Sequence, residues 1–195
     1  MSTRKYYNDK AKQFFDDTVN LDMEKLYRSF LDLIPEKGKI LDAGCGSGRD
    51  TLYFKNRGYS VTAFDYSEEL VKLASEHIGG TVLHMSFDDL TFKAEFDGIW
   101  ACASLLHVPK SKMKSVIDKL AEALKQGGIL YVSFKYGDKE EVRKDRLFSD
   151  YTEPAFTALV KKIPSLKIIK HWKTADVRPK RKGEYWFNVL IRKES

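Results

Sequence analysis

Three glycines on alternate positions follow a short apolar run in this chain of 195 residues. The run ends in Asp42-Ala43, and Gly44, Gly46 and Gly48 come next, before a helical pattern begins. Because glycine has no Cβ, such a turn can adopt positive φ and let the backbone approach a ligand at the N-terminus of a helix. The pattern predicts a turn that binds a nucleotide-like cofactor, and the alternative is a turn without a ligand.

The glycine spacing and the acidic residue before it narrow the choice of cofactor. A dinucleotide-binding turn reads Gly-x-Gly-x-x-Gly, with its third glycine one position later than Gly48. The carboxylate of Asp42 would repel a pyrophosphate, whereas it could pair with an ammonium group. The pattern therefore disfavours a dinucleotide and favours S-adenosylmethionine, whose tail is an amino acid.

Two segments carry a family resemblance. Asp42-Ala43-Gly44-Cys45-Gly46-Ser47-Gly48 resembles the first motif of class I S-adenosylmethionine-dependent methyltransferases, and residues 125–134 resemble the segment before the fifth strand of that family. The size of the chain and residues 46–54 are similar to the small tellurite-resistance and ubiquinone-type members. The resemblance covers residues 35–135 closely and the flanks only by the order of elements. It implies methyl transfer from S-adenosylmethionine.

A second carboxylate lies about 20 residues beyond the glycine turn, at the end of the apolar run that closes with Asp65. A carboxylate at the end of the second strand of such a sheet can accept both hydroxyls of a ribose. The alternative is an Asp that caps the helix beginning near Ser67. We expect Asp65 to bind the ribose.

The remaining cofactor contacts follow from the rule that ligands bind beyond the carboxyl ends of the strands in an open α/β sheet. The family resemblance often places an Asp where Ser86 stands here, so Asp88 or a backbone carbonyl could contact the adenine instead. The segment from Ala101 to Leu105 should border the sulfonium and the acceptor. The expected cofactor-binding residues are Asp42, Gly44, Cys45, Gly46, Gly48, Asp65, Tyr66, Ser86, Phe87, Asp88, Ala101 and Leu105.

The elements that must position these residues alternate between strand and helix patterns, which predicts an α/β fold with a doubly wound sheet. Helices are expected over 51–56, from Ser67 to Ile78, from Ser111 to Gly127-Gly128, and near 153–163. Strands are expected at 39–42, 61–65, 81–85, 96–101, 129–134, 166–172 and 185–192. No helix separates the last two strands, so they should pair antiparallel. The family resemblance implies a seven-stranded Rossmann-like sheet with a reversed last strand.

The N-terminal segment is rich in aromatic residues, among them Tyr7 and Phe14, and continues into an amphipathic helix that includes Phe30. It is either a lid over the cofactor, as the family resemblance implies, or a helical cap on the sheet. We expect one methyltransferase domain over residues 1–195. Its parts would be the N-terminal lid or cap at 1–35, the cofactor-binding core at 36–135 and the substrate-side elements at 136–195.

Catalytic residues are harder to predict because in-line methyl displacement needs positioning but no metal or covalent intermediate. His107 and Tyr136 follow strand ends and are the candidates for a general base. Leu106-His107-Val108, however, resembles a stretch of the methyltransferase family in which the histidine often has a structural role. The four histidines show no metal-ligand spacing. The segment beginning Ala101-Cys102 lacks the motifs of DNA amino and cytosine C5 methylation, and Cys102 is interpreted as a small core residue.

The acceptor should contact the C-terminal third, where residues 135–195 carry 16 basic and 9 acidic side chains. The basic segment 178–183 precedes aromatic residues. Because arginine presents a planar fork to oxyanions, we expect an anionic or planar acceptor to bind there. The predicted acceptor-binding residues are Arg178, Arg181, Trp172, Trp186 and Tyr7, and the alternative for the basic segment is a solvated hairpin.

Composition fits a cytoplasmic enzyme. The chain has 43% apolar residues, two cysteines and a net charge of +6, and it shows neither a secretion signal nor an apolar run long enough to span a membrane. The first hypothesis is a methyltransferase that acts on a small molecule. The alternatives are RNA methylation, which would give salt-dependent RNA binding, and S-adenosylmethionine binding without catalysis. The sequence assigns no acceptor and no oligomeric state.

Overall fold

A computed structural model describes residues 2–178, 181 and 183–194, so Pro179, Lys180 and Lys182 of the basic segment lie outside the described residues. The helices are α1 (Thr3–Asp9), α2 (Ala11–Thr18), α3 (Glu24–Leu31), α4 (Arg49–Asn56), α5 (Glu68–Ile78), α6 (Lys110–Ala123) and α7 (Glu153–Val160), with 3-10 turns η1 (Phe87–Asp89) and η2 (Leu105–His107). The strands are β1 (Lys39–Ala43), β2 (Ser60–Asp65), β3 (Leu83–His84), β4 (Phe96–Ala101), β5 (Leu124–Lys135), β6 (Glu140–Arg143), β7 (Arg146–Ser149), β8 (Leu166–Ala175) and β9 (Tyr185–Lys193).

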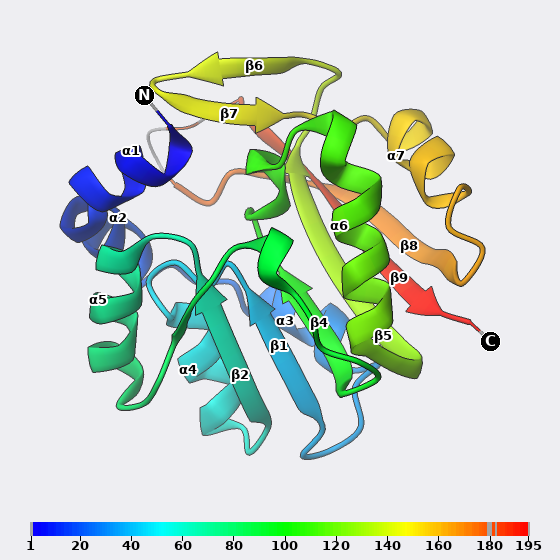
Figure 1. Cartoon of the computed structure of the whole chain (residues 1–195), viewed down its shortest axis with the longest axis horizontal. Coiled ribbons are helices and arrows are strands. Elements are labelled where there is room, and N and C mark those ends of the chain that lie inside the picture. The colour runs from blue at the N-terminus through cyan, green and yellow to red at the C-terminus, as the bar shows by residue number, and fades with distance from the viewer. Residues whose placement is uncertain (1, 179–180, 182, 195) are drawn as a thin grey trace.

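Seven strands form one twisted sheet in the order β3-β2-β1-β4-β5-β9-β8 (Figure 1). Neighbours from β3 to β5 pair parallel. Strand β9 pairs antiparallel with both β5 and β8, so it alone among these seven runs against the others. The predicted α/β class and the reversed last strand are confirmed. The carboxyl ends of β1, β2, β4 and β5 consequently meet at one edge of the sheet.

Several elements differ from the prediction in length. Strand β3 has two residues where five were expected. Helix α6 ends at Ala123, earlier than the expected stop at Gly127-Gly128, because Leu124 already pairs with Phe96 and so begins β5. The β6–β7 hairpin was not predicted. It joins at Lys144 and Asp145, whose positive φ values of 49° and 64° suit a tight two-residue turn.

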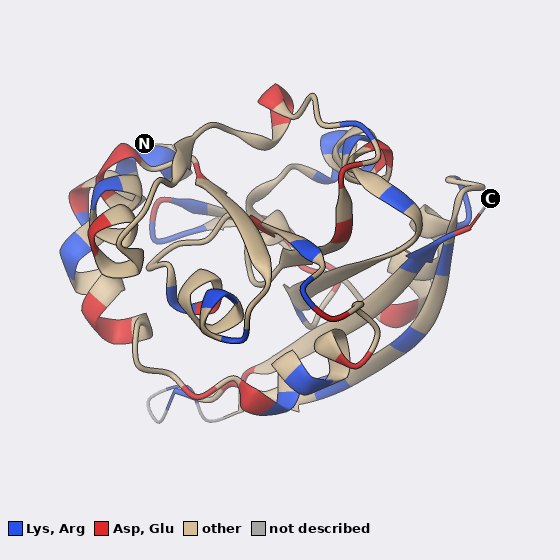
Figure 2. Ribbon diagram, turned by 90° about the horizontal axis from the view of Figure 1, so that it is seen from below, with Lys and Arg blue, Asp and Glu red and all other residues tan. Residues whose placement is uncertain are grey.

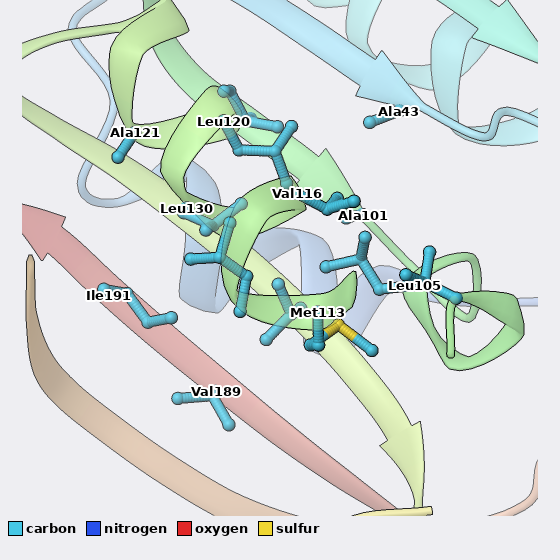
Figure 3. Close-up of a cluster of buried hydrophobic side chains, with 14 of the residues drawn as sticks. Ala43, Ala101, Leu105, Met113, Val116, Leu120, Ala121, Leu130, Val189 and Ile191 are labelled. Carbon is cyan, nitrogen blue, oxygen red and sulfur yellow. The ribbon is translucent and has the colours of Figure 1, made fainter. Parts of the chain in front are cut away.

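The core has two layers because neighbouring residues of a strand face opposite sides of the sheet. Helices α3 and α4 pack on one face, where Phe30 and Phe54 surround Trp100. Helix α6 packs on the other face. Figure 3 shows its side chains against those of the strands, the labelled residues being Ala43, Ala101, Leu105, Met113, Val116, Leu120, Ala121, Leu130, Val189 and Ile191.

The N-terminal segment divides between the two roles predicted for it. Helix α3 caps the sheet, since Tyr27 and Phe30 are buried in the core. Helices α1 and α2 instead lie beside α5 and the β6–β7 hairpin, at the edge where the strands end (Figure 1). Helix α3 thus packs on the sheet as the cap alternative requires, whereas a lid role for α1 and α2 stays a prediction.

Charged residues are mixed over the surface. Figure 2 shows blue and red segments interleaved along the helices and strands of the described chain. None of the described helices combines the length and the apolar content that a membrane crossing requires.

Candidate active site

A cavity of about 860 Å³ opens at the carboxyl ends of the central strands. The turn after β1, the end of β2, η1 and the segment after β4 form one part of its wall. Helices α1 and α2, strand β7 and residues 174–178 form the other part. The cavity therefore lies where the strand-end rule predicts a ligand, and segments from both ends of the chain close over it.

The glycine turn has the conformation that its spacing predicts. Gly44, Gly46 and Gly48 have φ values of 82°, 56° and 76°, which residues other than glycine rarely adopt. A Cβ on Gly44 would lie 2.5 Å from the Cβ of Ser104, so the turn also needs glycine for close packing. Gly44 and Gly46 border the cavity, whereas Gly48 packs against Ala74 of α5.

Asp65 borders the cavity with its carboxylate already oriented by the backbone. The N–H of Gly46 donates to Oδ2 and the N–H of Ser67 donates to Oδ1, each at 2.9 Å. Burial raises the pKa of Asp65, and these two N–H groups oppose that shift. A carboxylate has about four acceptor positions, so room remains for two hydroxyl donors. The arrangement fits the predicted ribose contact.

The turn after β3 holds Ser86 in place rather than leaving its hydroxyl free. Ser86 Oγ donates to Asp89 Oδ2 at 2.7 Å, and the Ser86 N–H donates to the same oxygen. Asp88 borders the cavity and forms an exposed ion pair with Lys112. Phe87 packs edge-on to Phe64. Phe87 and Asp88 are therefore the cavity-facing groups available to an adenine ring.

Asp42 does not border the cavity, which corrects the expected direct contact with an ammonium group. It is 2% exposed and accepts a hydrogen bond from Thr51 Oγ1 at 2.6 Å. Burial, together with the nearby Asp50 carboxylate, raises its pKa. Asp50, at the start of α4 just after the glycine turn, does border the cavity and was not predicted.

Asp50 is the centre of a buried hydrogen-bond network. It accepts from Arg49 Nε and Nη2 at 2.5 and 3.0 Å, from Trp100 Nε1 at 2.8 Å, and from the Tyr27 hydroxyl. These donors hold the pKa of Asp50 low against the effect of burial. Because Arg49 and Asp50 both border the cavity, this ion pair replaces Asp42 as the charged group beside the glycine turn.

The segment after β4 shifts the expected contacts by one or two residues. Ala101 and Leu105 are fully buried in the core below the cavity, and both belong to the hydrophobic cluster drawn in Figure 3. The cavity instead meets Cys102 to Ser104 and Leu106. Burial raises the pKa of the Cys102 thiol to about 12, so it remains protonated at neutral pH.

His107 pairs with Tyr7 inside the cavity. His107 Nδ1 lies 2.6 Å from the Leu147 carbonyl oxygen, and Nε2 lies 2.8 Å from the Tyr7 hydroxyl. The carbonyl can only accept, so Nδ1 carries the proton and Tyr7 donates to Nε2. Burial lowers the pKa of His107 to about 4. The imidazole is therefore neutral and serves as a hydrogen-bond acceptor. Tyr136, the other base candidate, does not border the cavity and packs against Lys173.

The two predicted arginines of the basic segment are already paired with carboxylates of the protein. Arg178 donates to both oxygens of Asp176, at 2.8 and 2.6 Å, and Arg181 lies 3.5 Å from Glu184. Asp176 also accepts from Lys135 and from Trp186 Nε1. Both arginines and Trp186 border the cavity. Trp172 does not, because it packs on the opposite face of the sheet with the α3 side of the core.

The cavity thus brings together most of the predicted site residues. Those on its wall are Tyr7, Gly44, Cys45, Gly46, Asp65, Tyr66, Ser86, Phe87, Asp88, His107, Arg178, Arg181 and Trp186. Those placed elsewhere are Asp42, Gly48, Ala101, Leu105, Tyr136 and Trp172.

Several wall residues were not predicted. They include Asn8 of α1, Arg49 and Asp50, Lys135, Arg146 and Asp176. Arg49 and Asp50 directly follow the glycine turn, so their position at the start of a helix was an available signal. The others come from segments whose place in the fold depends on tertiary packing, and no local pattern marks them.

Comparisons with known proteins agree with this geometry. A family described as "Methyltransferase domain" matches residues 40–128. A putative methyltransferase of Bacillus subtilis is 33% identical over 132 residues, 62% of this chain and 52% of that protein. A ubiquinone biosynthesis O-methyltransferase of Xylella fastidiosa is 34% identical over 108 residues, 51% of this chain and 43% of that protein. The chain therefore spans about half the length of these two relatives.

The fold is also similar to that of a solved methyltransferase. The Burkholderia thailandensis 1,6-didemethyltoxoflavin-N1-methyltransferase, whose structure contains 1,6-didemethyltoxoflavin and S-adenosylhomocysteine, matches with a TM-score of 0.80. The sequences are 22% identical, and the match covers 98% of this chain and 87% of that one. This similarity establishes the fold.

Proposed function

We propose that this chain transfers the methyl group of S-adenosylmethionine to a small-molecule acceptor, since residues 40–128 match a family described as "Methyltransferase domain". One observation carries the proposal. The glycine turn and the oriented Asp65 line the same cavity, which also has room for an acceptor. The relatives named above are themselves methyltransferases, one of ubiquinone biosynthesis and one of didemethyltoxoflavin.

The cofactor end of the cavity fits S-adenosylmethionine in shape and charge. Gly44 and Gly46 leave the backbone bare, and a Cβ on Gly46 would lie 3.0 Å from the ring of Phe14. Asp65 would accept the ribose hydroxyls, and the Arg49–Asp50 pair offers both charges to the amino-acid tail. Phe87 and Asp88 would contact the adenine.

The acceptor end supports a small molecule. Helices α1 and α2 contribute Tyr7 and Phe14 to the wall, and Asn8 Oδ1 accepts a hydrogen bond from Ser67 Oγ at 2.7 Å, which ties α1 to the start of α5. A cavity closed in this way admits a compact acceptor more readily than a folded polymer. Its volume of about 860 Å³ is within the range of about 300–1,000 Å³ typical of small-molecule sites.

The chemistry requires positioning more than acid–base groups. When bound, S-adenosylmethionine supplies an electrophilic methyl group for in-line displacement by the acceptor. The protein would hold the acceptor close and exclude water, which can account for about 7–11 kcal/mol of a barrier. Neutral His107 would position Tyr7, since its low pKa makes it a weak base.

Part of the basic charge on which the RNA alternative depends is paired within the protein. In the C-terminal third, Lys135, Arg143 and Arg178 each pair with at least one carboxylate. Nucleic-acid binding depends on basic side chains that remain free to contact phosphates. These three side chains are therefore already engaged by carboxylates and are less available to phosphates.

A titration with S-adenosylmethionine tests the cofactor part of the proposal. Asp65→Ala should raise the dissociation constant of S-adenosylmethionine, measured by calorimetry, at least about tenfold, because a charged acceptor for two hydroxyls is lost. Asp118→Ala, which removes an exposed carboxylate paired only with Lys114 on α6, should leave the affinity unchanged. Equal affinity of the wild type and Asp65→Ala would remove Asp65 from the site, and failure of the wild type to bind would refute the proposal.

A further inference from the structure

Arg146 lies on the cavity wall where the β6–β7 hairpin contacts the N-terminal helices, at the end that we propose for the acceptor. It is the first residue of β7, directly after the two-residue turn, and its side chain borders the cavity. The same hairpin fixes His107 through the Leu147 carbonyl, and the Leu147 N–H donates to Thr3 Oγ1 of α1 at 3.0 Å. Arg146 is thus part of the contact between the hairpin and the N-terminal helices, which lie side by side in Figure 1.

The guanidinium of Arg146 is short of hydrogen-bond acceptors. Its five N–H donors have one contact, from Nη1 to the Tyr7 hydroxyl at 3.4 Å, and its Nε is buried without a partner. Aromatic rings surround it instead, with Tyr6, Phe148 and Tyr7 centred 4.4, 5.0 and 5.7 Å from Cζ. Rings stabilise the positive charge but do not replace in-plane acceptors.

The neighbouring arginine shows that this shortage is specific to Arg146. Arg143 faces Arg146 across the hairpin, and it binds both Glu141 and Asp150. No carboxylate pairs with Arg146 among the residues that the structure describes. Like charges directly opposite each other destabilise a strand pair, so the second arginine opposes hairpin stability.

Three other buried or half-buried cations on the cavity wall are paired with carboxylates of the protein. Arg49 pairs with Asp50, and Lys135 and Arg178 pair with Asp176. Arg146 is therefore the one of these four whose hydrogen-bonding capacity is left for a ligand.

We propose that Arg146 binds a carboxylate of the methyl acceptor, an inference that rests on the function proposed above. A carboxylate matches the planar fork of a guanidinium through two parallel hydrogen bonds. The rings of Tyr6, Tyr7 and Phe148 keep water away, which strengthens such a contact, and they favour an acceptor with a flat apolar body. The structure thus moves the expected anion contact from Arg178 and Arg181 to Arg146.

A matched pair of probes tests this inference on the whole 195-residue chain. The probes are 4-hydroxybenzoate and 4-hydroxybenzamide, which differ in charge but hardly in shape, and binding is measured by ligand-observed NMR with S-adenosylhomocysteine present. The wild type should bind the carboxylate at least about tenfold more tightly than the amide, as expected for one charge-assisted pair. Arg146→Gln should abolish this preference, and Arg146→Lys should restore part of it.

Lys144→Gln is the control, because it removes one positive charge from the exposed turn of the same hairpin. It should keep the preference for the carboxylate. S-adenosylhomocysteine affinity, measured on every variant, reports folding and the cofactor site. Absence of S-adenosylhomocysteine binding by the wild type would refute the proposed function. The assignment of Arg146 would be overturned if the wild type binds S-adenosylhomocysteine normally but does not bind the carboxylate or does not prefer it to the amide. It would also be overturned if Arg146→Gln keeps the preference for the carboxylate.

Discussion

Gly44 and Gly58 have nearly the same backbone conformation but different surroundings. Their φ values are 82° and 86°, so alanine is strained at either position by about 1 kcal/mol. A Cβ on Gly58 would meet nothing within 4 Å, whereas one on Gly44 would lie 2.5 Å from Ser104 Cβ. The difference between the two sites isolates the packing of the cofactor turn.

We therefore expect Gly44→Ala to lower the free energy of unfolding by about 1–3 kcal/mol more than Gly58→Ala does, since overpacking adds to the φ strain. It should also weaken S-adenosylmethionine binding, because the turn must shift away from Ser104. Urea denaturation and calorimetry measure the two effects. Equal losses at the two glycines would show that the contact with Ser104 does not constrain the turn.

At the residue scale, the sequence predicts those site residues whose type and spacing are typical of one local structure. Glycines on alternate positions and an Asp at a strand end identify the turn and Asp65. The sequence could not distinguish Asp42 from Asp50, because which carboxylate turns toward the cavity depends on Thr51, Tyr27 and Trp100. Likewise, the sequence places Asp176 two residues before Arg178, but the ion pair between them is evident only from the structure.

At the scale of elements, the N-terminal helices separate into a cover and a support. Phe14 of α2 borders the cavity, whereas Phe30 of α3 is 0% exposed in the core. The same substitution at the two positions should therefore have different consequences.

Phe30→Ala should lower the free energy of unfolding by about 3–5 kcal/mol, the usual loss for a buried phenylalanine. Phe14→Ala should change stability less and should weaken S-adenosylmethionine binding, because its ring lies against Gly46. Thermal unfolding with and without S-adenosylhomocysteine measures both effects. A large loss of stability with unaltered affinity for Phe14→Ala would mean that α2 supports the fold and does not cover the site.

The β6–β7 hairpin shows what hydrophobic periodicity fails to predict. Residues 140–149 hold six charged side chains and only a few apolar ones, so no alternating pattern marks β6 and β7. Their pairing depends on the tight turn at Lys144 and Asp145 and on contacts with η2 and α1. This unpredicted element carries Arg146, so the part of the cavity that we propose for the acceptor is the part that local sequence patterns describe least.

At the scale of the whole molecule, the sheet was predictable because its signals are redundant. Alternating strands and helices require a parallel sheet, and two consecutive strands without a helix require a reversal. Charge was not predictable in the same way. The net charge of +6 reflects composition, whereas ion pairs such as Lys135–Asp176 depend on the fold.

The most direct test of the central claim is transfer of labelled methyl groups from S-adenosylmethionine to a cell extract divided into small-molecule, RNA and protein fractions. We expect label in the small-molecule fraction with the wild type and much less with Asp65→Ala. Label confined to RNA or to protein, or S-adenosylmethionine binding without transfer to any fraction, would contradict the account.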